Sequence, residues 1–162
     1  MRVVLDTNTL VSGIISSGGP PRRLLDGART QAFESYSSAI LLAELLDVLN
    51  RDKFARRLEV AGLTPLGIVI DLRRLVRLVE PADVPRVIPA DPDDDHVLAC
   101  AIAARAELIV SGDRHLLDLG SDYRGIHIAS PAEAVSILWG WWLASAYPDC
   151  RPASTDFCLQ GS

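Results

Sequence analysis

The chain has 162 residues, of which 49% are hydrophobic and 23% are charged. This length suits one domain, and the composition is that of a folded globular protein rather than a disordered one. The formal net charge of −5 argues against a simple basic nucleic-acid binder, because affinity for phosphate backbones comes largely from Lys and Arg. We expect a single domain over residues 1–142, followed by a C-terminal tail at 143–162 that is disordered or contacts a partner.

The cysteines and the first residues favour the cytoplasm. The three cysteines, Cys100, Cys150 and Cys158, form no CxxC pair, and an odd count of this kind suggests a reducing compartment. The opening apolar run meets the polar residues 6–8 too early for the core of a signal peptide. The longest uncharged stretch, residues 134–148, is shorter than the ~20 apolar residues that a membrane helix needs. The sequence therefore predicts a soluble protein without a membrane segment.

The first half of the chain alternates short apolar runs with helical patterns. In chain order, we expect a strand at 3–5, a loop with a short helical turn at 7–21, a helix from Pro20 through Ala28, a strand at 32–37, a helix at 38–49 and a charged helix at 51–60. The helix at 38–49 has Ser37 or Ser38 available as its N-cap.

The second half continues the alternation. We expect a helix from Thr64-Pro65 with apolar residues to Val79, a strand at 84–88, a helix at 93–106, strands at 108–110 and 126–128, and a helix that begins at the capping box 130–133. Pro85 and Pro89 restrict the strand at 84–88 to a sheet edge or a strand end. Apolar strands that alternate with amphipathic helices indicate βαβ units, and hence an α/β fold whose parallel sheet is covered on both faces.

Acidic residues follow this pattern at one end of the expected strands. Asp6 and Asp113 come just after two buried strands, Glu44 lies inside a helix, and Asp94 and Asp95 lie in the first turns of another. Each has an ordinary structural explanation on its own, such as a turn acid or a carboxylate that complements a helix dipole. Because ligands of open α/β sheets bind beyond the carboxyl ends of the strands, their joint placement predicts one shared site.

Carboxylates that converge in this way point to metal chemistry. They repel one another and would be driven towards protonation unless cations shared the site. Hard oxygen ligands suit Mg²⁺ or Mn²⁺, which can activate water for hydrolysis of a phosphodiester without a covalent intermediate. The chain has no Gly-rich phosphate loop followed by Lys, so nucleoside triphosphate chemistry has little support.

Other reactive or aromatic residues receive simpler interpretations. The three histidines, His96, His115 and His127, share no metal-ligand spacing and are interpreted as surface or edge residues. Cys100 is interpreted as a small buried apolar group. The helix that carries Trp139 and two further tryptophans is too apolar for a free surface, so we expect it to pack on the core or on a partner.

These motifs resemble the PIN-domain family, and especially the VapC-like toxin ribonucleases of type II toxin–antitoxin systems. Residues 3–8 (VVLDTN) are similar to that family's apolar strand followed by DTN, and residues 108–113 (LIVSGD) to its strand that ends in Thr-x-Asp, with Ser111 in place of the Thr. Glu44 matches the helix acid. Asp95 matches the third acid, with Asp94 as the alternative. The similarity spans roughly residues 1–135.

The resemblance implies a three-layer α/β/α sandwich and an Mg²⁺- or Mn²⁺-dependent endoribonuclease with an RNA substrate. It also implies a homodimer or higher homo-oligomer, and inhibition by a cognate antitoxin protein. The residues that it implies for the site are Asp6, Glu44, Asp95 and Asp113 as metal ligands, with Asn8 and Ser111 as residues that orient them. Our own candidates for phosphate contacts are Arg22, Arg23 and Arg114, because each neighbours a proposed site element.

Three other interpretations remain to be compared with this one. A receiver domain also has acids at strand ends, but it needs a lysine at the end of a later strand, and the sole lysine, Lys53, lies in a charged helical segment. A metal-dependent phosphatase of the haloacid-dehalogenase type needs a second acid where Asn8 stands. A PIN fold that only binds RNA or protein is the non-enzyme alternative, which the loss of an acid would favour.

Overall fold

The computed structural model describes the backbone of residues 1–83 and 92–146, and the side chains of residues 1–83 and 94–140. The described helices are α1 (Thr7–Ile15), α2 (Pro20–Arg29), α3 (Ala39–Leu49), α4 (Asp52–Val60), α5 (Pro65–Leu75), α6 (Pro92–Ala104), α7 (Arg114–Leu117) and α8 (Pro131–Ala146). The described strands are β1 (Arg2–Leu5), β2 (Glu34–Ser37), β3 (Arg77–Leu78), β4 (Leu108–Val110), β5 (Asp122–Tyr123) and β6 (Ile126–Ala129). The strand expected at 84–88 lies outside these residues.

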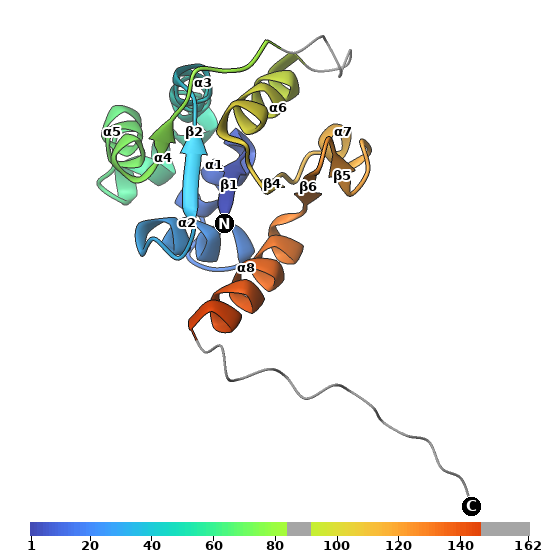
Figure 1. Ribbon diagram of the computed structural model, residues 1–162. Coiled ribbons are helices and arrows are strands. Elements are labelled where there is room, and N and C mark those ends of the chain that lie inside the picture. The colour runs from blue at the N-terminus through green and yellow to red at the C-terminus, as the bar shows by residue number, and fades with distance from the viewer. Residues whose placement is uncertain (84–91, 147–162) are drawn as a thin grey trace, which may run out of the picture.

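The strands form one six-stranded sheet in the order β3-β2-β1-β4-β6-β5. Each neighbouring pair is parallel except β5 and β6, which form an antiparallel hairpin at one edge. The predicted parallel sheet is therefore confirmed, with β1 at its centre. Figure 1 shows α4 and α5 at the end of the molecule beyond β2, and α7 with β5 at the opposite end.

Helices cover both faces of the sheet, because successive strand residues point to opposite sides. On β1, Val3 and Leu5 belong to one apolar cluster and Val4 belongs to the other. The first cluster receives buried side chains from α1, α2, α3, α4, α5 and α8, and the second receives them mainly from α6 and α7. This arrangement confirms the expected α/β/α sandwich.

The segment after β1 differs from the prediction of a loop with a short turn. It forms the full helix α1, whose N-terminus is capped by Asp6 through a 2.6 Å hydrogen bond from the Thr9 N–H. The loop is confined to residues 16–19, and Gly13, inside the helix, serves packing instead. A Cβ at Gly13 would lie 2.6 Å from the backbone oxygen of Pro21, so a side chain there would block the close approach of α1 to α2.

The helix expected to reach Val79 also differs, because α5 ends at Leu75 and β3 follows it. The residue after α5, Val76, is extended, and β3 then pairs in parallel with β2, with Ser37 opposite Leu78. Backbone pairing with the sheet overrides the helical spacing of the apolar residues here. Short elements α7 and β5 were not predicted either.

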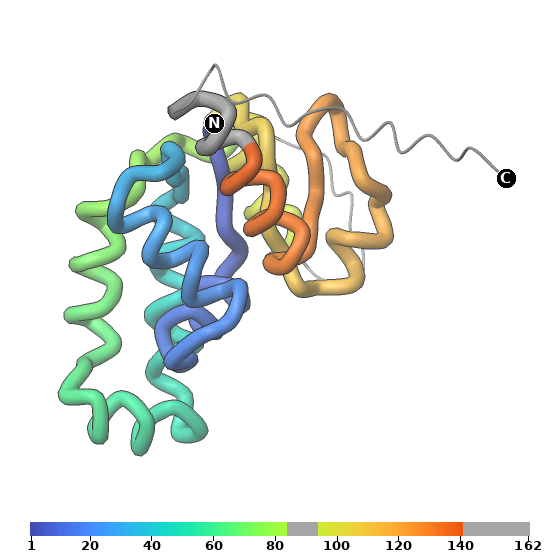
Figure 2. The backbone as a smooth tube through the Cα atoms, turned by 90° about the horizontal axis from the view of Figure 1, so that it is seen from below, coloured from blue at the N-terminus to red at the C-terminus, as the bar shows by residue number. Residues whose placement is uncertain are grey.

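The last helix confirms its predicted start and shows what it packs against. Ser130 and Glu133 form the capping box, in which the Ser130 N–H donates to the Glu133 carboxylate at 2.9 Å. Leu138 is buried in the first cluster, and Trp139 packs against that cluster. Figure 2 shows α8 between α2 and the β5–β6 hairpin. The helix runs to Ala146, so the boundary expected at residue 142 falls inside it.

Cys100 is fully buried, as expected, and burial raises the pKa of its thiol to about 12. It therefore stays protonated and does not act as a nucleophile at neutral pH. Among the described residues, no helix is long and apolar enough to cross a membrane.

Candidate active site

The candidate site begins where β1 and β4 end side by side. Leu5 is paired with Val110, and the Asp6 N–H donates to the Val110 carbonyl oxygen at 3.0 Å. The chain then turns into α1 after Asp6 and into α7 after Asp113. Both predicted strand-end acids therefore lie at the carboxyl edge of the sheet, next to helix N-termini.

Ser111 joins these two acids. Its hydroxyl donates to Asp6 Oδ2 at 2.5 Å and accepts a hydrogen bond from the Asp113 N–H at 2.9 Å. Ser111 is fully buried, so both hydrogen bonds are shielded from water. The Ser111 hydroxyl thus fixes the position of one acid relative to the other.

The environment of Asp6 disfavours its charged form. Burial raises the pKa of its carboxyl, whereas the hydrogen bonds from Ser111 and Thr9 lower it and the nearby charge of Asp113 raises it again. The net direction is upward. A carboxylate in this position becomes easier to ionise when a cation lies beside it.

These acids line a pocket of about 180 Å³, here called the acidic pocket. Its lining residues are Asp6, Thr7, Asn8, Glu44, Val48, Arg51, Asp94, Val97 and Asp113. Four predicted site residues are among them, together with Asp94, the alternative for the third acid. Asp95 is half-buried and is not in this lining.

His115 adds a nitrogen donor at the rim of the acidic pocket. Its side chain is 48% exposed, as expected for a surface residue, yet Nδ1 lies 3.3 Å from Asp113 Oδ1 and 3.6 Å from Asp94 Oδ2. One donor atom from each of these three residues lies within 4.8 Å of the others. Sequence reasoning missed this contact because it compared histidines only with one another. The position of His115 two residues after Asp113 was the available signal.

The residues present fit a divalent cation. The pocket offers carboxylate oxygens from four separate segments of the chain, which are the ligands that Mg²⁺ and Mn²⁺ prefer. Thr7 also lines it, and its hydroxyl oxygen is buried without a hydrogen-bond partner among the described residues. A buried hydroxyl without a partner is rare in proteins, and a bound ion or its water is one way to satisfy it.

The arginines separate into two groups. Arg51, which was not predicted, lines the acidic pocket from the turn between α3 and α4, where it is the N-cap residue of α4. Arg114 directly follows Asp113 and is exposed. Arg22 instead forms an ion pair with Asp26 at 3.1 Å, and Arg23 lies over the Trp139 ring, 5.2 Å from its centroid.

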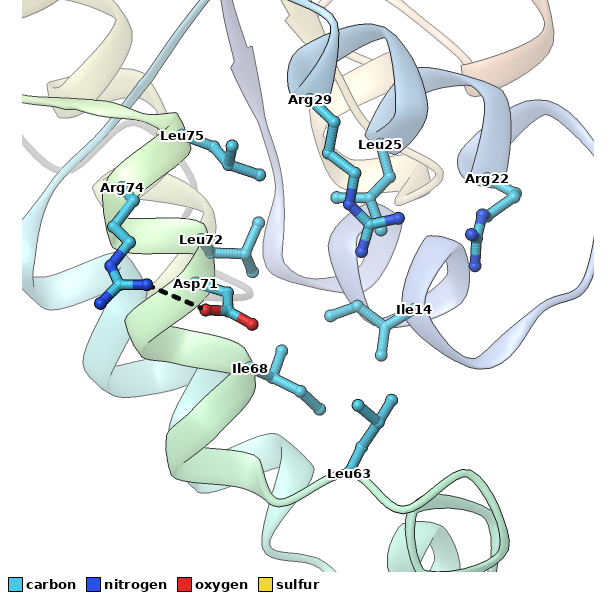
Figure 3. A pocket seen from close by; sticks show the side chains of 10 residues that line it. All are labelled: Ile14, Arg22, Leu25, Arg29, Leu63, Ile68, Asp71, Leu72, Arg74 and Leu75. Atoms are coloured by element: carbon cyan, nitrogen blue, oxygen red, sulfur yellow. Dashed lines mark ion pairs between the residues drawn. The ribbon is translucent and has the colours of Figure 1, made fainter.

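Arg22 belongs to a second pocket of about 320 Å³ between α5 on one side and α1 and α2 on the other, here called the apolar pocket (Figure 3). Its floor consists of aliphatic side chains, among them Ile14, Leu25 and Leu72. Arg29 and Arg74 lie at its edge with Arg22. Neither Arg22 nor Arg23 lines the acidic pocket.

A comparison with protein families agrees with this geometry. The model of the PIN domain family matches residues 2–115, which includes both strand-end acids, Glu44 and Asp94. The chain belongs to the PIN domain family. PIN domains are in general metal-dependent nucleases, and the cluster of Asp94, Asp113 and His115 has the donor atoms and spacing to hold a metal ion. A search of curated proteins finds no match to the chain.

Proposed function

We propose that this protein is a metal-dependent endoribonuclease that hydrolyses RNA phosphodiester bonds with water. The observation that carries the proposal is the Ser111 bridge between Asp6 and Asp113 at the edge of a pocket that Asp94 also lines. The bridge holds the Asp6 carboxylate in a buried position where its charged form is disfavoured. A turn with only a structural role has no need of such a carboxylate. A hydrolytic metal site does need carboxylates that are fixed in place.

The residues have distinct tasks in this proposal. Asp6, Glu44 and Asp113 would hold Mg²⁺ or Mn²⁺ together with a third acid, for which we favour Asp94 over Asp95 because it is buried and lines the pocket. The chemistry that such a cation supplies when bound is activation of a water molecule and polarisation of the phosphodiester. Ser111 and the Thr9 N–H keep both oxygens of Asp6 fixed.

Basic residues at the opening would bind the RNA backbone. Arg51 is exposed and lines the acidic pocket, whereas Asn8, which lines it from the first turn of α1, would orient the acids. Arg114, exposed beside Asp113, can reach a phosphate on the same side. Positive side chains around an acidic centre let an overall acidic protein bind a polyanion.

We further propose that the enzyme is the toxin of a toxin–antitoxin pair. The support is the resemblance of its four acid motifs to VapC-like toxins, and this proposal includes a cytoplasmic location, a homodimer or higher homo-oligomer, and a cognate antitoxin. Growth of cells that express the wild type or Asp6→Asn provides the test. We expect arrest only with the wild type, and arrest with both variants would contradict a nuclease toxin.

The proposed activity is tested directly with purified protein and a structured RNA pool. We expect cleavage with Mg²⁺ or Mn²⁺, none with excess chelator, and none with Asp6→Asn in the presence of metal. Asp26→Asn, which changes a half-buried aspartate of α2 outside the acidic pocket, is the matched control and should cleave normally. Full activity of Asp6→Asn would exclude the proposed site. Tight RNA binding without cleavage under any metal would favour a binding module instead.

A further inference from the structure

We propose that His115 is itself a ligand of the metal ion, so that the site binds Mn²⁺ more tightly than Mg²⁺. The inference rests on the proposed function, since it concerns the same metal site. It adds a nitrogen donor to a site that the sequence predicted to consist of oxygen ligands alone.

The distances around His115 suit neighbouring ligands of one ion. Octahedral Mg²⁺ or Mn²⁺ with ligands at ~2.1 Å separates adjacent ligand atoms by about 3.0 Å and opposite ones by about 4.2 Å. His115 Nδ1 lies 3.3 Å from Asp113 Oδ1 and 3.6 Å from Asp94 Oδ2. All three donor atoms are within 4.8 Å of one another. Small side-chain rotations would therefore bring the three atoms to one ion.

The backbone holds His115 in this place. Asp113 caps α7, and its Oδ1 accepts a 2.8 Å hydrogen bond from the His115 N–H. The next residue, Leu116, is fully buried in the second apolar cluster and anchors the short helix to the core. Thus His115 is exposed at its ring, while the chain on both sides of it is fixed.

The nature of the donor decides which ion is favoured. Mg²⁺ prefers oxygen ligands and keeps several waters, so an imidazole adds little to its binding. First-row transition ions accept imidazole nitrogen more readily. We expect His115→Gln to weaken Mn²⁺ binding by roughly tenfold, the lower range for perturbation of a metal site, and to change Mg²⁺ binding by less than about twofold.

The experiment uses the full-length protein with Mn²⁺ as the probe. Pulsed electron paramagnetic resonance of bound Mn²⁺ detects coupling to a directly coordinated nitrogen. We expect this coupling in the wild type and in His127→Gln, whose exposed histidine on β6 is the matched control. It should disappear in His115→Gln. A melting curve verifies that this variant is folded, which is expected because the ring is exposed.

His96→Gln is the second variant, because His96 follows the acids of α6 and its Nδ1 is buried. Loss of the nitrogen coupling in His96→Gln, with retention in His115→Gln, would overturn the assignment. Bound Mn²⁺ with no nitrogen coupling in the wild type would overturn it as well, while metal-dependent cleavage would leave the nuclease intact. Failure to bind any Mn²⁺, together with absence of cleavage, would remove both proposals.

Discussion

The acidic pocket and the apolar pocket treat their charged residues in opposite ways. In the apolar pocket, Asp71 lies 3.7 Å from Arg74 on the same helix, and the neighbouring Asp26 pairs with Arg22 and Arg29. In the acidic pocket, by contrast, neutral donors hold Asp6 in place, namely the Ser111 hydroxyl and the Thr9 N–H. Arginines compensate the charges of Asp26 and Asp71 locally, whereas neutral donors orient Asp6.

The comparison of the two pockets shows that volume alone does not identify the candidate active site. The apolar pocket is the larger one, at about 320 Å³ against 180 Å³. It lies between helix faces, where a gap is lined by aliphatic side chains. The acidic pocket lies at strand ends, where the chain turns and polar groups from distant segments meet. A carboxylate that is buried, oriented and beside other carboxylates is the better indicator of function.

The largest effect on RNA cleavage is expected from Asp94 of the acidic pocket, with Asp71 of the apolar pocket as its control. Asp94→Asn should lower RNA cleavage by at least about 10²-fold, the loss typical when an electrostatic stabiliser of an active site is removed. Asp71→Asn, which disrupts only an exposed ion pair, should leave the rate within about twofold. The measurement is the initial rate of cleavage at saturating metal.

Asp95→Asn completes this test, because the sequence favoured Asp95 as the third acid. We expect it to retain most activity, since Asp95 is outside the lining of the acidic pocket. If Asp95→Asn is inactive and Asp94→Asn is active, Asp95 is the third acid and the pocket must rearrange on metal binding.

The next effect concerns the residue that orients the acids. Ser111→Ala removes the donor to Asp6 and the acceptor for the Asp113 N–H, so metal affinity should fall by roughly 10- to 100-fold. Titration calorimetry with Mn²⁺ measures this loss. Ser38→Ala is the control, because Ser38 is equally buried but caps α3. It should cost about 1 kcal/mol of stability without a change in metal affinity.

The sequence was informative where local signals and tertiary contacts agree. The apolar runs predicted β1 and β4, and the positions of these strands put Asp6 and Asp113 at one edge of the sheet. The capping residues Ser130 and Glu133 predicted the start of α8. Prediction failed where a distant partner decides the outcome. β3 forms because β2 is beside it, and α1 is a helix although its Gly and Ser residues suggested a loop.

At the candidate site, too, local signals could be predicted from the sequence, whereas contacts between distant segments could not. A motif gives the residue type and its element, but not which neighbour on a helix faces inward, so Asp94 and Asp95 could not be separated. His115 and Arg51 approach the acids from α7 and from the turn between α3 and α4, whose positions depend on packing. Such contacts need the three-dimensional arrangement.

A smaller effect is expected from the arginines. Arg51→Gln should raise KM for RNA several-fold with little change in kcat, because one phosphate contact contributes mainly to binding. Arg22→Gln should change neither, since Arg22 is paired with Asp26 in the apolar pocket. Steady-state kinetics at two salt concentrations provide the check. An equal rise of KM in Arg22→Gln would show that the RNA path extends over α2, as its sequence position suggested.

The smallest effect is on stability, and its sign depends on pH and metal. Burial raises the pKa of Asp6, so without metal its contribution to stability is fully present below the unfolded pKa of ~3.9 and is lost as the pH rises through the folded value. At pH 7 the buried charge is a cost that Asp6→Asn removes. With chelator present, we therefore expect the variant to melt a few degrees above the wild type at pH 7, and the difference to shrink towards pH 4.

Metal should reverse this order. At a concentration of 100 times its Kd, a ligand that binds only the folded state stabilises it by ~2.7 kcal/mol, and the wild type alone should gain this from Mn²⁺. Differential scanning calorimetry at pH 4 and 7, with chelator and with Mn²⁺, measures all four conditions. A wild type that melts above Asp6→Asn at pH 7 in chelator would mean that hydrogen bonds from Ser111 and Thr9 outweigh burial. The acidic pocket would then resemble the apolar pocket in holding its charges without help from an ion.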